Sequence, residues 1–209
     1  MAVDGSIPGP REAIDEVGPQ EASLDWNEEL VEQRRGHWTH QLRPRLAGLT
    51  DEEYLWEPVE GCWSLRPADP AGGEQVTGQS FRLNLVRPSP DPAPVTTIAW
   101  RLAHLIVSVL GRRVAGILGG PPVDEASFPF AGTAAVALDQ LDEVYAAWID
   151  GVRGLGEAGL RRPCGPSETA YGNLADLPRA SLVLHISREL IHHGAEIALL
   201  RDLHRAGRR

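Results

Sequence analysis

The chain is poor in residue types that several protein classes need. Lysine does not occur in the 209 residues, and the only cysteines are Cys62 and Cys164. These two lie far apart and form no CxxC pair, so neither a disulfide framework nor a zinc ribbon is available. We expect both to be reduced thiols. The missing lysines accompany abundant alanine, and we interpret this as a composition bias without chemical meaning.

Long apolar runs and targeting signals are also missing. No run of about 18 apolar residues occurs, which excludes a membrane-spanning helix at the level of sequence. The N-terminal stretch MAVDGSIPGPREAIDEVGPQEASLDW lacks the basic and apolar regions of a signal peptide. We therefore expect a cytoplasmic protein with no membrane partner.

Basic residues are also fewer than acidic residues. The chain has 29 acidic and 20 basic residues, and its formal net charge is -9. This balance opposes the phosphate neutralisation that provides most nucleic-acid affinity. The arginines are scattered, apart from a C-terminal HRAGRR that is typical of a solvated tail. We expect no nucleic-acid partner.

The length and the local composition predict one domain with an N-terminal extension. A chain of 209 residues can bury one substantial core and is short for two. Residues 1–23 are rich in Gly, Pro and Glu without periodicity, which predicts a flexible N-terminal arm. The domain should then span residues 24–209.

Helical periodicity dominates the rest of the chain. Four stretches have apolar residues at helical spacing with plausible start and stop signals, and they span about 25–49, 96–118, 132–155 and 177–203. The segment between the first two includes FRLNLV, which is too short to be more than a strand-like or extended segment, and no sheet is required. An all-α fold follows, in the form of a four-helix bundle with long loops, where sites are built from inward side chains of facing helices.

His104 is the first candidate for chemistry. Residues 102–111 read LAHLIVSVLG, so His104 and Ser108 are the only polar side chains in this part of the predicted helix. A single histidine in such a place is more often a core residue satisfied by a neighbouring group. His104 alone is therefore weak support for a site.

The last predicted helix adds more polar groups, because LHISRELIHHGAEIALL places His185, Glu189, His192, His193 and Glu196 within a few turns of an otherwise apolar segment. Residues four apart stack on one helix face, so Glu189 and His193 can reach a single point. His192, three residues from Glu189, could replace His193. The alternative is a solvated polar edge with a Glu–His pair.

Two imidazoles and one carboxylate suit a divalent metal and leave coordination positions open, as in catalytic sites. We therefore predict a metal site made by His104, Glu189 and His193. Zinc is the first choice, and nickel and manganese are the alternatives. Trp63 and Trp100 are candidates for lining the mouth of the site, with core packing as their other role.

The motif HISRELIHHGAEI resembles the fourth helix of the DinB/YfiT-like proteins, whose usual pattern is a His, three residues, a second His, one residue, then Gly, Gln and Ile. In that register Glu189 and His193 stand at two ligand positions and Glu196 at the Gln. WRLAHL then places His104 on the family's ligand in the second helix. The resemblance covers about residues 24–203 and includes the loop EPVEGCWSLRP.

The resemblance implies a metal-dependent protein acting on small molecules. Glu189 replaces the common histidine, as in the His, Glu, His zinc set of the related mycothiol-dependent maleylpyruvate isomerase. The implied activity is a thiol (mycothiol-type) S-transferase or isomerase, or a hydrolase, acting on a small electrophile, with His192 or Glu196 orienting a ligand or carrying a proton. The alternative is a non-catalytic metal- or ligand-binding bundle with a stress-response or accessory role. A homodimer is left open.

Overall fold

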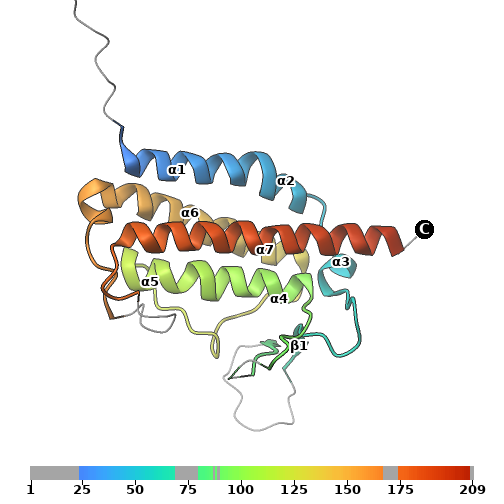
Figure 1. The fold of residues 1–209 in the computed structure, drawn as a ribbon. Helices are drawn as coiled ribbons and strands as arrows, with labels where there is room; N and C mark the ends of the chain where they lie inside the picture. The colour runs from blue at the N-terminus through green and yellow to red at the C-terminus, as the bar shows by residue number, and fades with distance from the viewer. Residues whose placement is uncertain (1–23, 69–79, 87, 89, 167–173, 208–209) are drawn as a thin grey trace, which may run out of the picture.

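The computed structural model describes residues 24–68, 80–86, 88, 90–166 and 174–207. The predicted N-terminal arm, residues 1–23, lies outside these residues. The described chain is mostly helical, which confirms the all-α fold (Figure 1). Within the described residues, no helix combines the length and the apolarity that a membrane crossing needs.

The first long helical segment has three parts. α1 (Trp26–His37) continues through the π-helical segment η1 (Trp38–Leu42) into α2 (Arg43–Leu46). Asp25 caps its start, because the side chain accepts hydrogen bonds from two backbone N–H groups of the first turn. The predicted helix over 25–49 is thus confirmed, with its end at Leu46.

A short helix, α3 (Asp51–Leu55), follows, and a capping box made by Thr50 and Glu53 holds its first turn. The chain then forms two short antiparallel strands, β1 (Leu65–Pro67) and β2 (Phe81–Leu83). The sequence required no sheet, so this strand pair was not predicted, although β2 lies in FRLNLV, the segment predicted to be strand-like or extended. Each strand has only three residues, too short for an alternating pattern, and the pairing joins segments that are distant in sequence.

The second long segment carries the first candidate ligand. It comprises α4 (Ile98–Ala103), the π-helical segment η2 (His104–Gly111) and α5 (Arg112–Leu118). It ends at Gly119, whose φ of 73° is a left-handed conformation that glycine adopts without strain. π-Helical segments are often found at functional sites, and η2 begins at His104.

Two longer helices complete the fold. α6 (Ala134–Leu160) starts at the Thr133 cap and kinks at Gly156, close to the predicted end at residue 155. α7 (Arg179–Gly207) is the longest helix and confirms the helix predicted over 177–203, with both ends shifted by a few residues.

The four long helical segments lie side by side (Figure 1) and share an apolar core. α6 contacts α1 and the α4–η2–α5 segment, and α7 contacts η2 and α1. Burying a leucine- or isoleucine-sized side chain contributes about 1.5–3 kcal/mol. Leu105 of η2 and Ile186 and Ile197 of α7 are fully buried in this core, and η2 and α7 are in contact.

Candidate metal centre

His104 lies at the start of η2 and is half-buried among aromatic rings. Its imidazole stacks on the indole of Trp100, one turn earlier, with ring centroids 5.2 Å apart and an interplanar angle of 13°. Its other neighbour is His193 of α7, whose ring meets it edge-on with centroids 4.8 Å apart. Among the described residues, no hydrogen-bond partner is found for the two ring nitrogens of His104.

The surroundings of His104 favour its neutral form. Burial, with smaller electrostatic contributions from His193, Arg101, Arg113 and Arg112, lowers the pKa of His104 to about 3. The imidazole is therefore unprotonated at neutral pH and keeps a lone pair. A neutral imidazole is the form that binds metal ions.

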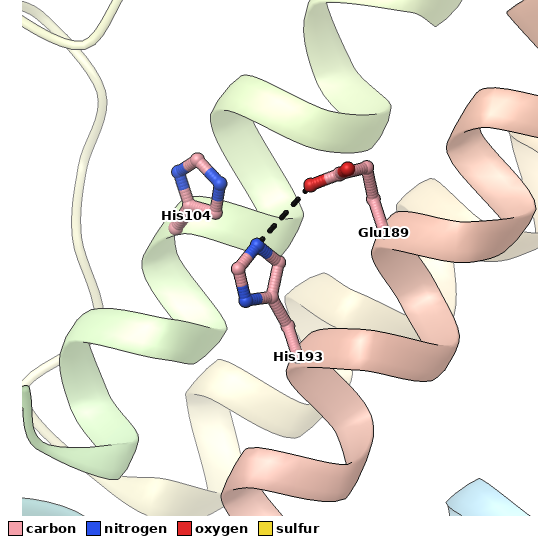
Figure 2. A group of neighbouring side chains, drawn as sticks. All are labelled: His104, Glu189 and His193. Atoms are coloured by element: carbon pink, nitrogen blue, oxygen red, sulfur yellow. Dashed lines mark ion pairs between the residues drawn. The ribbon is translucent and has the colours of Figure 1, made fainter.

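The other two candidate ligands lie one turn apart on α7. Nε2 of His193 is 3.3 Å from Oε2 of Glu189, and His193 is buried whereas Glu189 is half-buried. Figure 2 shows both side chains and His104 converging from two neighbouring helices. One ligand atom from each of the three residues lies within 4.8 Å of the others.

The spacing of these atoms is compatible with a shared ion after small side-chain rotations. Ligands about 2.1 Å from a tetrahedral zinc ion lie about 3.4 Å from one another. Among the described residues, His104, Glu189 and His193 form one of two groups that meet the donor and distance requirements. The second group contains His192, His193 and Glu196.

Glu196 supports His193 from the side away from Glu189. Oε2 of Glu196 lies 2.7 Å from Nδ1 of His193 and 3.1 Å from Nε of Arg101. Nη1 of Arg101 is also 3.3 Å from Nδ1, but the closer carboxylate favours a proton on Nδ1. His193 then presents the lone pair of Nε2 to Glu189 and His104. A carboxylate–histidine pair of this kind orients metal-binding imidazoles.

His192 lies outside the first group. Its side chain is 66% exposed, and its Nε2 is 3.4 Å from Oε1 of Glu196. His185 is also peripheral, with Nδ1 3.8 Å from Oε1 of Glu189. The structure thus brings together the three predicted ligands and places the two predicted proton carriers, His192 and Glu196, beside them.

The two predicted mouth residues occupy different positions. Trp100 contacts His104 directly, and its indole N–H donates to the carbonyl oxygen of Asn84 at 2.7 Å. Trp63 contacts Trp100, with ring centroids 5.8 Å apart. Trp63 is therefore one side chain further from His104 than Trp100 is. Their role in binding a cofactor or substrate stays a prediction.

A comparison with known protein families gives a match that spans the candidate ligands. The family profile described as the DinB superfamily matches residues 35–197, more than half of the chain and all three candidate ligands. The chain belongs to the DinB superfamily. No curated protein and no solved structure matches it. The resemblance seen in the motif is confirmed for the superfamily, and the match carries no particular reaction, substrate or metal.

In this DinB-superfamily chain the sequence reasoning missed two supporting residues. Arg101 pairs with Glu196 across the helix interface, and the available signal was an arginine three residues before His104 in an apolar helix. Gly194 follows His193 and faces Leu42, whose Cδ1 would lie 2.7 Å from an added Cβ. A glycine here lets α7 approach η1 closely beside the ligands.

Proposed function

We propose that this DinB-superfamily chain is an enzyme that holds one divalent ion between His104, Glu189 and His193. The support is the neutral, half-buried imidazole of His104, which has no hydrogen-bond partner in the described part of the chain and meets His193 edge-on. Zinc is our first choice, with nickel and manganese as alternatives. The packing of the four long helical segments favours a four-helix bundle of the DinB/YfiT-like type.

The reaction we propose is attack on a small electrophile by a low-molecular-weight thiol of the mycothiol type or by water. A bound divalent ion would lower the pKa of such a thiol or water and so supply a nucleophile at neutral pH. The sulfur or oxygen would then bond to the electrophilic carbon while a leaving-group bond or a π bond of that carbon breaks, and the proton of the thiol or water would pass to the released group or to solvent. The corresponding activity is that of an S-transferase, an isomerase or a hydrolase.

The chain's own residues supply orientation and a route for the proton. Glu196 fixes His193 through Nδ1, and Arg101 holds the Glu196 carboxylate in place by an ion pair. The second carboxylate oxygen of Glu196 faces His192, which is exposed and can exchange protons with solvent. We propose Glu196 as the orienting group and His192 as the proton carrier, with Trp100 and Trp63 at the approach of the substrate.

Thiol-transfer assays with a panel of small electrophiles test this function. We expect turnover by the zinc-loaded protein that is lost in His193→Ala and after treatment with a chelator. Turnover no greater than that of free zinc would instead favour a non-catalytic metal-binding bundle with an accessory role. Comparing a mycothiol-type thiol with water as the only nucleophile separates transferase from hydrolase activity.

A further inference from the structure

A cavity lies on the face of α7 away from the candidate ligands, where this helix packs beside α1 and η1. Its volume is about 610 Å³, within the range of small-molecule sites. At 100° per residue, Leu184, Ser187 and Ile191 face it from the side of α7 opposite Glu189 and His193. Its walls are largely apolar, and the aliphatic side chains that line it are Leu30, Leu42, Leu184, Leu190 and Ile191.

Arg34 of α1 is the notable polar group in this cavity. It is 6% exposed, and its Nη2 donates to the carbonyl oxygen of Val183 at 3.0 Å and to Ser187 Oγ. Its Nε and Nη1 have no hydrogen-bond partner, and no carboxylate in the described part of the chain forms an ion pair with it. Burial lowers the pKa of Arg34 to about 10, against a smaller opposing effect of Tyr145.

Burying a cation without a counter-ion costs free energy. Because the Arg34 guanidinium lies beside a cavity, an anion bound in the cavity would supply the missing counter-ion. The rim carboxylate of Glu32 does not fill this role, because it pairs with Arg35 at 2.7 Å. Among the described residues that line the cavity, Arg34 is the only arginine, and His37 and His40 are the other basic side chains. A single guanidinium suits a singly charged carboxylate better than a phosphate dianion. Guanidinium and carboxylate groups also match in bidentate geometry.

The cavity also has a rigid aromatic wall. Trp38, the first residue of η1, stacks on Tyr145 of α6 with ring centroids 3.7 Å apart and an interplanar angle of 7°. The hydroxyl of Tyr145 donates to the backbone carbonyl of Arg34 at 3.2 Å, which fixes the wall relative to the cation. The local π-helical geometry of η1 is a second feature that is common at functional sites.

We propose that this cavity binds a small carboxylate with an apolar or aromatic body, its head group on Arg34 and its body against Trp38 and the leucine walls. Nε and Nη1 are covered by protein, so binding requires the guanidinium to turn toward the cavity that it lines. The site is separate from the proposed metal centre and does not depend on the reaction proposed there.

Calorimetric titration of the full chain with octanoate and with 3-phenylpropanoate tests this site. Because carboxylates also bind metals, the protein is first stripped with a chelator, and His193→Ala is titrated in parallel. We expect saturable binding of at least one acid to both proteins, no binding of the matching amides, and at least about tenfold weaker binding by Arg34→Met. Failure of both acids, equal binding of acid and amide, unchanged affinity in Arg34→Met or loss in His193→Ala would each overturn the proposal.

A second pair of variants keeps the test decisive if Arg34→Met does not fold. Leu184 and Leu199 are both half-exposed leucines of α7, at 50% and 58%, but only Leu184 lines the cavity. Leu184→Trp should fill part of the cavity and weaken carboxylate binding at least about tenfold, whereas Leu199→Trp should leave it unchanged. Native affinity in Leu184→Trp, or an equal loss in both variants, would contradict a ligand in this cavity.

Discussion

Nδ1 of His193 lies 2.7 Å from Oε2 of Glu196, one turn further along α7. This contact determines which nitrogen of His193 faces the proposed ion, because a proton donated from Nδ1 leaves the lone pair on Nε2. Nε2 is the atom that lies 3.3 Å from Glu189. In the proposed centre, Glu189 and Glu196 therefore have different roles, with Glu189 as a ligand and Glu196 as the group that orients His193.

Replacing Glu196 tests this division of roles. Glu196→Leu should weaken metal binding by about 10 to 100-fold, because Nδ1 of His193 loses its acceptor. Glu196→Gln keeps a carbonyl oxygen that can accept the same bond and should lose much less affinity. Competition with a chelating dye measures both constants. Both variants leave Arg101 without its carboxylate, so equal losses would show that the acceptor at Nδ1 is not what matters.

The adjacent histidines of α7 should behave very differently. His193→Ala should lose most of its metal affinity, because one of three anchoring bonds disappears. His192→Ala removes an exposed side chain beside Glu196 and should cost at most about 10 to 100-fold. The same dye competition compares them. Should His192→Ala empty the site and His193→Ala leave it filled, the register would be wrong by one residue, with Glu189 and His192 as the pair.

The lowered pKa of His104 predicts that the metal-free protein loses stability in acid. In the unfolded chain this group binds a proton below its ordinary pKa of 6.5, whereas in the fold it does so only near about 3. Acid therefore favours the unfolded state across this window, by about 2 kcal/mol from this group at pH 5. Urea unfolding at pH 7 and pH 5 should show a smaller acid loss in His104→Leu. An equal loss in both proteins would contradict a neutral buried imidazole.

A buried ion pair fastens the C-terminal part of α7 to α3. Arg201 is 1% exposed and its Nη2 donates to Oε2 of Glu53 at 2.9 Å. Glu53→Leu should lower the free energy of unfolding by about 3–5 kcal/mol, because it leaves an uncompensated buried charge. The exposed pair of Arg35 and Glu32 is the control, and Arg35→Ala should cost less than about 1 kcal/mol. Urea denaturation measures both, and similar losses would show that burial of the pair is unimportant.

The helices could be predicted because their signals are local. The Asp25 cap, the Gly119 stop and the apolar spacing of each helix lie within a few residues of the structure that they specify. The strand pair could not, because Leu65 pairs with Leu83, which is distant in sequence, and neither strand is long enough to show alternation. The π-helical geometry at His104 has no comparable signal in the sequence.

Helical spacing and the sequence motif predicted part of the candidate site. Glu189 and His193 share one helix face, so their proximity follows from sequence, whereas the approach of His104 needed the family resemblance. The pairing of Arg101 with Glu196 joins two helices and depends on how they pack. The cavity beside Arg34 arises only where α1, η1, α6 and α7 meet, so no local pattern could indicate it.

Metal analysis of protein purified without a histidine tag tests the central claim most directly. The account predicts about one equivalent of a divalent ion in the native chain and far less in His104→Ala, with a higher melting temperature when the ion is bound. A native chain that is purified empty, and whose melting temperature does not move with added zinc, nickel or manganese, would contradict a metal centre at His104, Glu189 and His193.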